Sequence, residues 1–157
     1  MTALPFNNLE LDFGVSLLDA EYDDYFTLDP NNISAGVQDL SGNKMIGAPE
    51  VTINFSAKYT AEIYDWGNLT LRSDYYYSDD VFFTQFENPK AMQGAYSVVN
   101  ALISFEAMDK SWRSSLYGKN LNNETIFSNV FVGAGLYGEV AILEPPRTYG
   151  IEFEFYF

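Results

Sequence analysis

Apolar residues occupy nearly every second position along six segments of the chain. Side chains of a β-strand point alternately to its two faces, whereas those of a helix return to one face about every 3.6 residues. The pattern therefore predicts six strands, each with one apolar face. The predicted strands are residues 9–17, 51–63, 69–77, 95–107, 112–118 and 149–157.

Charged residues follow the same period on the opposite face of these strands. Both signs of charge occur there, and none falls on an apolar face. A helix would not keep this phase over six segments. The charged residues of this face are Glu10, Asp12, Lys58, Glu62, Arg72, Asp74, Glu106, Arg113, Lys119, Glu152 and Glu154.

The connections between the predicted strands alternate in length. IYDWGN and EAMDKS are short hairpins, and LPFNN before the first strand has the composition of a turn. The other three connections are long, at residues 18–50, 78–94 and 120–147. Short turns at one end and long loops at the other predict an all-β, up-and-down antiparallel meander, with function concentrated in the loops.

Two interpretations of the apolar face are open. In a soluble β-sandwich or small barrel, it would pack on a core. In a transmembrane β-barrel, it would face lipid, and the charged face would line a wet lumen. Mid-strand charges of both signs, long loops on one side only, and aromatic residues near the strand ends favour the barrel. These aromatic residues are Tyr64, Trp66, Trp112 and Phe157 at the short turns, and Tyr75, Tyr76, Tyr77, Tyr96 and Tyr149 at the loops.

Six strands are too few for a barrel of their own. Single-chain bacterial barrels begin at about eight strands. An open sheet would leave two unpaired edges, which the hydrocarbon of a membrane does not tolerate. The membrane interpretation therefore expects this chain to be one part of an oligomeric barrel or a piece of a longer protein.

Composition narrows the function further. The 157 residues carry 22 acids and 8 bases, a net charge of −14, which excludes a nucleic-acid partner. The chain has no Cys and no His, which removes thiolate metal sites and every Ser-His or Cys-His dyad. We predict no catalytic residue, no cofactor and no enzyme activity. No apolar run is long enough for a membrane-spanning helix, and MTALPFNNLE does not have the pattern of a secretory signal.

Two motifs point to ligands only weakly. Gly133, Gly135 and Gly138 have dinucleotide-loop spacing, but the following EVAILE meets two prolines where that fingerprint needs a helix. DPNNISAG fails as a calcium loop because Ile33 occupies an oxygen-ligand position. We predict no metal site, and we interpret the neighbouring acids as a solvated rim, with loose divalent binding as the alternative. The acids of this rim are Asp19, Glu21, Asp23 and Asp24.

An ordered set of segments resembles the C-terminal part of TonB-dependent outer-membrane receptors. GKNL, the APE that enters a strand, and the final RTYG followed by a terminal Phe are its more specific pieces. The segments are LDAEYDDY (18–25), GAPEVTINFSAKY (47–59), GNLTLRSDYYYSDDVFF (67–83), YSVVNALISFE (96–106), WRSSLYGKNLNNE (112–124) and PPRTYGIEFEFYF (145–157).

The resemblance implies a fold, a location and partners. Such receptors form a barrel of about 22 strands around an N-terminal plug. They take up a scarce nutrient, often a ferric siderophore, using a TonB complex that contacts a short N-terminal box. Residues 1–157 would be the C-terminal part of the barrel domain, without the plug and the earlier strands, and MTALPFNN would hold the tail of the preceding strand and its turn. The long loops would be extracellular and the C-terminus periplasmic, in the outer membrane of a bacterium.

The candidate residues fall into two groups. Contacts with a small-molecule ligand such as a metal chelate are expected from loop aromatics and acids: Tyr22, Asp23, Tyr25, Phe86 and Tyr137. The resemblance further implies that Gly150, Phe153, Phe155 and Phe157 of the last strand are read by the barrel-assembly machinery. A soluble β-rich binding module and a passive porin stay open as alternatives. The first would bury the face that contains Leu11, Phe55 and Phe153 against another layer of this chain.

Overall fold

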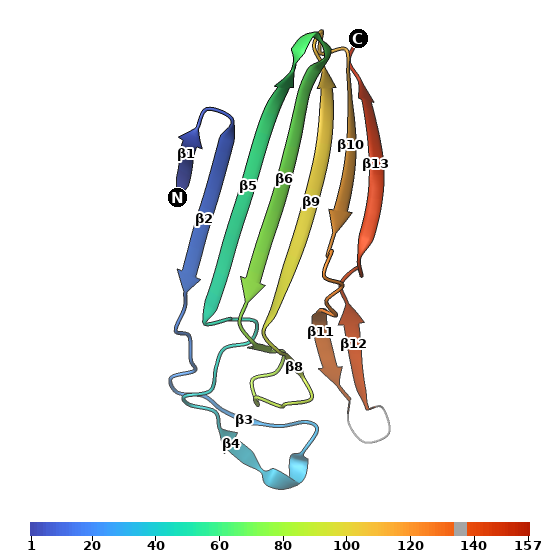
Figure 1. Cartoon of the computed structure of the whole chain (residues 1–157). Helices are drawn as coiled ribbons and strands as arrows, with labels where there is room; N and C mark the ends of the chain where they lie inside the picture. Colours follow the sequence, from blue (N-terminus) through green and yellow to red (C-terminus); the bar gives the residue numbers. More distant parts are fainter. Residues whose placement is uncertain (134–137) are drawn as a thin grey trace.

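A computed structural model describes residues 1–133 and 138–157, and its main feature is a seven-stranded antiparallel sheet (Figure 1). The strand order is β1-β2-β5-β6-β9-β10-β13, so strands that follow one another in the sheet also follow one another along the chain. The all-β antiparallel meander predicted from the sequence is confirmed. Its strands are β1 (Thr2–Phe6), β2 (Leu9–Leu17), β5 (Val51–Ile63), β6 (Gly67–Ser78), β9 (Tyr96–Ala107), β10 (Trp112–Lys119) and β13 (Thr148–Phe155).

Strand β1 is an addition to the six predicted strands. It pairs with β2, placing Thr2 opposite Asp12 and Phe6 opposite Leu9, with a register shift in between. The shifted stretch contains Pro5, which has no N–H to give to a ladder. LPFNN is therefore only partly a turn: its first three residues belong to β1. The expectation that MTALPFNN holds the end of a preceding strand is met.

The register of the sheet separates the two faces that the sequence predicts. Phe13, Phe55 and Tyr75 lie directly opposite one another on β2, β5 and β6. The next row along the same strands places Asp12, Ser56 and Asp74 opposite one another. Since neighbouring residues of a strand point to opposite sides, successive rows lie alternately on an apolar face and on a polar face.

No layer covers the apolar face in the part of the chain that the structure describes. The exposed fractions of Phe55, Ile103 and Phe153 are 41%, 48% and 65%. The buried apolar residues in residues 1–133 and 138–157 are few and small, and they lie at the ends of the sheet or in the loops rather than on this face. They are Leu40, Ala91, Ala107 and Val130. The packed core that a soluble sandwich requires is thus missing from the described residues.

The three long connections lie at one end of the sheet and carry small hairpins (Figure 1). These loops are joined to one another. Asn43 Nδ2 donates to the Gln85 carbonyl at 3.0 Å, and the Lys44 N–H donates to Glu87 Oε1 at 2.7 Å. The hairpins are β3 (Phe26–Leu28) with β4 (Val37–Asp39), β7 (Val81–Phe82) with β8 (Met92–Gln93), and β11 (Phe127–Val132) with β12 (Glu139–Leu143); a 3₁₀ turn, η1 (Ile33–Ala35), lies between β3 and β4.

The opposite end of the sheet has only short turns. A single 3₁₀ turn, η2 (Tyr64–Trp66), joins β5 to β6, and residues 108–111 join β9 to β10. The two turns are connected, because the Met108 N–H donates to the Trp66 carbonyl at 3.0 Å. Among the residues described, no helix is long and apolar enough to cross a membrane.

Gly67 makes the first of these turns possible. Its φ of +145° is a conformation that residues with a side chain rarely adopt, and a Cβ there would collide with the Glu106 carbonyl oxygen. We predict that Gly67→Ala lowers the free energy of unfolding by at least about 2 kcal/mol, from backbone strain and steric conflict. Urea unfolding of the full chain in detergent micelles, followed by circular dichroism, measures this effect.

Gly14→Ala is the matched control for Gly67→Ala. Gly14 lies in β2, and a Cβ there would have no atom within 4 Å. Its stability is expected to stay within about 0.5 kcal/mol of the parent chain. Equal effects of the two substitutions would contradict the structural role assigned to Gly67.

Candidate functional site

The polar face carries ion pairs between partly exposed side chains. Lys58 Nζ lies 3.3 Å from Glu10 Oε2 on the neighbouring strand, and Arg72 Nη2 lies 2.8 Å from Asp74 Oδ1 on its own strand. Pairs of this exposure contribute only about 0–1 kcal/mol each to stability. They are therefore better explained by a wet face than by a need for structural support.

Near the short turns, Arg113 and Glu154 form a pair that joins two neighbouring strands. Arg113 Nη2 donates to both oxygens of Glu154, at 2.6 and 2.7 Å, and Nε donates to Oε1 at 3.2 Å. The Tyr156 hydroxyl also donates to Glu154 Oε2 at 2.7 Å. This group links β10 to the last strand at the end of the sheet where the chain terminates (Figure 1).

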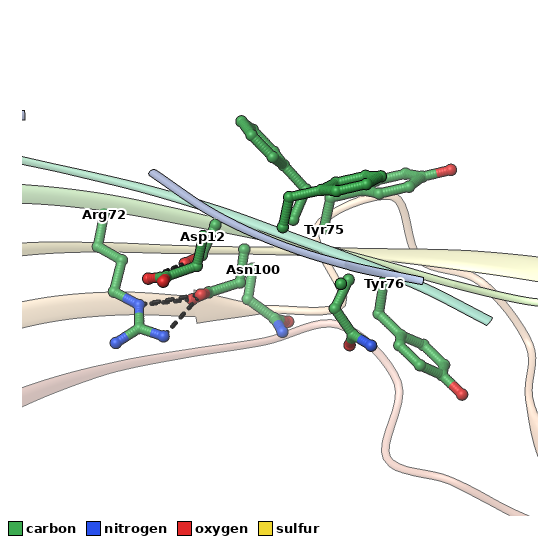
Figure 2. Close-up of a pocket in the computed structure, with 11 residues that line it drawn as sticks. Asp12, Arg72, Tyr75, Tyr76 and Asn100 are labelled. Atoms are coloured by element: carbon green, nitrogen blue, oxygen red, sulfur yellow. Dashed lines mark hydrogen bonds and ion pairs between the residues drawn. The ribbon is translucent and has the colours of Figure 1, made fainter. Parts of the chain in front are cut away.

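A central hollow of about 460 Å³ lies on the polar face. Figure 2 shows Asp12, Arg72, Tyr76 and Asn100 on one side of the sheet and Tyr75 on the other, as the register requires. The dashed contacts of Arg72 run to the carboxylate of its partner on the same strand. The polar-face residues that line the central hollow are Asp12, Gly14, Asn54, Ser56, Arg72, Asp74, Tyr76 and Asn100.

A second hollow, the tyrosine hollow, adjoins the first toward the loops. Its volume is about 490 Å³, and the rings of Tyr76 and Tyr96 lie 6.0 Å apart within it at an angle of 57°. Tyr76 and Asn100 line both hollows, so the two form one surface. Aromatic rings beside amides and carboxylates suit a small organic ligand that is held by stacking and hydrogen bonds. The remaining lining residues are Val98, Ile126, Phe127, Ser128 and Glu144.

The GKNL segment (residues 118–121) and the Asn122 that follows it form hydrogen bonds with β9 beside the two hollows. The Asn120 N–H donates to Asn100 Oδ1 at 2.9 Å, which fixes the side chain in the hollow. Asn122 takes the place of a strand partner for β9, since its Oδ1 accepts from the Val99 N–H at 3.1 Å and its Nδ2 donates to the Ser97 carbonyl at 2.6 Å. Leu121 of the motif donates its N–H to the Val99 carbonyl at 2.8 Å, so GKNL and the Asn122 that follows it continue the pairing of β9 beyond the end of β10.

The residues of the two hollows were missed as candidates in the sequence. Tyr76, Asn54 and Asn100 have no motif of their own, and their type is common in loops and strands alike. The available signal was their position in the alternating pattern: they occupy the same set of alternate positions as Asp12 and Arg72, which is the set that forms the polar face. This alternation identifies the face to which a residue belongs, but it does not identify which residues of that face surround a hollow.

The predicted ligand contacts that the structure describes, Tyr22, Asp23, Tyr25 and Phe86, lie in the loops and do not line either hollow. Tyr22 and Tyr25 form a ring pair 5.0 Å apart, and Asp23 between them is exposed. Asn43 accepts from the Tyr22 N–H and donates to the Gln85 carbonyl, so the structure brings the loop of Tyr22 next to that of Phe86. Tyr137 lies outside the described residues.

The loop end is acidic, and two of its lysines, Lys44 and Lys90, form ion pairs with glutamates. Lys44 Nζ lies 2.7 Å from Glu50, and that hydrogen bond, with smaller contributions from Asp80 and Asp79, raises the pKa of Lys44. Lys90 pairs with Glu139 at 2.9 Å across two loops and lowers the pKa of that carboxyl. Within residues 1–133 and 138–157, no group of three or more acidic, His or Cys side chains is arranged to hold a metal ion.

The last strand is slightly shorter than predicted. It ends at Phe155, and Tyr156 and Phe157 follow it. Phe153 and Phe155 are exposed on the apolar face, whereas Gly150 lies opposite Tyr117, whose ring fills the space that a Cβ at Gly150 would need. Only β10 pairs with this strand in the described sheet, so its other edge is open.

Three solved structures share this arrangement of strands over 97% of the chain. The ferric yersiniabactin uptake receptor FyuA from Yersinia pestis aligns with a TM-score of 0.78 and 18% identity. The siderophore receptor PiuA and the ferric preacinetobactin receptor BauA, both from Acinetobacter baumannii, align with TM-scores of 0.71 and 0.67 and identities of 17% and 16%. The resemblance seen in the sequence is thus confirmed at the level of the fold.

The chain spans only about a fifth of the receptors that it resembles, 21% of FyuA and 20% of each of the others. These neighbours are TonB-dependent β-barrel receptors of the outer membrane, with a role in transport rather than catalysis. No protein-family model matches the chain, and no curated protein matches it either. What the comparisons establish is that the chain has the fold of a segment of such a receptor.

Proposed function

We propose that this chain is the C-terminal part of the barrel of a TonB-dependent receptor, which takes up a scarce nutrient such as a ferric siderophore across a bacterial outer membrane. The observation that carries this proposal is the uncovered apolar face on a sheet that has the fold of a siderophore-receptor segment. In lipid, the exposed side chains of this face need no covering layer.

The two open edges of the sheet define the partners that the proposal requires. β1 and β13 each have one paired edge in the described sheet, and free edges are not tolerated in hydrocarbon. Further barrel strands would therefore pair with both. The polar face would line the lumen and face a plug, and energy would come from a TonB complex through an N-terminal region outside residues 1–157.

The orientation and the last strand belong to the same proposal. The hairpin-bearing loops would be extracellular, and the short turns and C-terminus would be periplasmic. Gly150, Phe153, Phe155 and Phe157 would serve the barrel-assembly machinery as a signal. The position of the two exposed phenylalanines on the apolar face of an edge strand supports this role, since they are accessible before the barrel closes.

Lipid exposure of the apolar face predicts an asymmetric response to added charge. Leu71 lies in the middle of β6 on the apolar face, and Thr70 precedes it on the polar face. We expect Leu71→Arg to lower the free energy of unfolding from phospholipid vesicles by about 2–4 kcal/mol, the cost of Arg near a bilayer midplane. The matched Thr70→Arg should cost less than about 1 kcal/mol, because water reaches that face. Similar effects at both positions would argue for a water-exposed sheet.

The reading frame upstream of the Met1 codon tests directly whether residues 1–157 belong to a longer receptor. We expect it to continue in frame and to encode further strands of alternating hydrophobicity and a plug domain. Sequencing of the transcript that contains this region makes the measurement. An upstream stop codon with a ribosome-binding site at Met1 would overturn the proposal, and upstream strands without a plug would favour a passive porin.

The loop residues Tyr22, Asp23, Tyr25, Phe86 and Tyr137 are proposed as ligand contacts. For a receptor that contains this segment, we expect Tyr22→Ala to weaken binding by about fivefold or more, as loss of an aromatic contact does. Phe26→Ala is the control, since Phe26 is an exposed aromatic of the same loop outside the Tyr22–Tyr25 pair. Binding is measured by titration with a panel of ferric siderophores, and equal losses in both variants would contradict the assignment.

A further inference from the structure

A cleft of about 670 Å³ opens at the short-turn end of the sheet, away from the polar hollows. It lies between the turn that joins β5 to β6 and the turn that joins β9 to β10, which the hydrogen bond from Met108 to Trp66 ties together. Figure 1 shows these turns at the end of the molecule that also holds the C-terminus. The lining residues of this short-turn cleft are Asp65, Trp66, Phe105, Ala107, Met108, Asp109 and Trp112.

The apolar wall of the cleft continues the apolar face. The rings of Phe105 and Trp112 lie 5.5 Å apart, and Trp112 is directly opposite Phe155 on the last strand. Trp66 and Met108 are 76% and 56% exposed at the rim. An aliphatic chain that lies on the apolar face can therefore run into the cleft without crossing a polar barrier.

The charges of the cleft are of one sign. Its two ionisable lining residues are Asp65 and Asp109. Asp109 accepts from the Ser111 hydroxyl at 2.7 Å and from the Ser111 N–H at 3.0 Å, and these bonds lower the pKa of its carboxyl, so it stays charged at neutral pH. Lys110 follows on the exposed side of the turn and forms no ion pair with any residue in the described ranges.

Aromatic rings beside carboxylates favour an ammonium group. A cation over the face of Trp or Phe is attracted by the ring quadrupole, and the carboxylates add a direct charge attraction. A ligand whose only charge is a phosphate or carboxylate would meet two negative charges instead, so in a zwitterionic ligand the ammonium group must be the part that enters the cleft. An occupant that combines an ammonium group with aliphatic chains matches both the charge of the cleft and its continuity with the apolar face.

We propose that the short-turn cleft binds the headgroup of an ammonium-bearing zwitterionic phospholipid, whose acyl chains lie along the apolar face. This inference rests on the proposed function, because it requires that face to contact lipid. It adds a specific lipid site at the membrane boundary, with Asp65 and Asp109 as the headgroup contacts and Trp66, Phe105 and Trp112 as the walls.

The chain contains an internal reporter for this site. Its two tryptophans, Trp66 and Trp112, both line the cleft. Lipids with brominated acyl chains quench tryptophan fluorescence on contact, so quenching of the full chain in micelles measures occupancy of this cleft directly. The probes are brominated phosphatidylethanolamine and brominated phosphatidylglycerol at equal mole fractions.

We expect phosphatidylethanolamine to reach half-maximal quenching at a mole fraction about fivefold lower than phosphatidylglycerol. The double variant Asp65→Asn/Asp109→Asn should lose this preference and keep its fold, since an Asn at 109 retains an oxygen for the Ser111 N–H. Asp24→Asn, in the loops at the other end, is the control and should keep the preference. Circular dichroism verifies the fold of each variant.

Three results would overturn the inference. Equal quenching by both lipids would show ordinary lipid contact without a headgroup site. A preference for phosphatidylglycerol that is lost in Lys110→Ala would show that the turn binds an anionic lipid through Lys110 instead. Absence of quenching by either lipid would refute the proposed function as well, because the apolar face would then not contact lipid at all.

Discussion

The alternation of side chains across a pleated sheet is the constraint on which this molecule depends. Each strand of the main sheet from β2 to β13 keeps its charged residues on one face, and the pairing registers align these faces across the sheet. A shift of one residue between two strands would place Arg72 or Lys58 on the apolar face. The long, nearly regular registers therefore keep the charged residues on one side of the sheet and the apolar face on the other. Both the hollows and the short-turn cleft depend on this separation of polar and apolar side chains.

The strands from β2 to β13 in the main sheet could be predicted from the sequence, because apolar and polar residues alternate along them with the period of a β-strand. Periodicity did not reveal β1, because Pro5 interrupts the period and the strand pairs through a shifted register; only the family resemblance implied a strand there. The hairpins of the loops were also missed: the strands β3, β4, β7 and β8 have only two or three residues, too few for a detectable period, and FSNVFV of β11 does not alternate between apolar and polar residues. The face of the candidate site was thus predictable, but the hollows on it were not.

The hollows depend on contacts between residues far apart in sequence. Asn100 is held by Asn120 at the start of a loop, and Tyr76 meets Tyr96 across two strands and the loop that joins them. GKNL was recognised as a family motif, but its physical role appears only when Asn120 is seen to bond to Asn100 and Leu121 to Val99. A motif of side-chain amides can therefore be found from sequence similarity, whereas its partners come from the fold.

The bonds between the loops have a consequence for how such receptors diversify. Asn43 and Lys44 of one loop bond to Gln85 and Glu87 of the next, and Lys90 of that loop bonds to Glu139 of the third. The three loops form one interlocked cap rather than three independent appendages. A graft of a single loop from one of the structurally similar receptors would leave the Asn43 amide or the Glu87 carboxylate without its partner. If the proposed receptor function holds, new specificities are expected to arise by small changes at the surface of the cap, or by exchange of the cap as a whole.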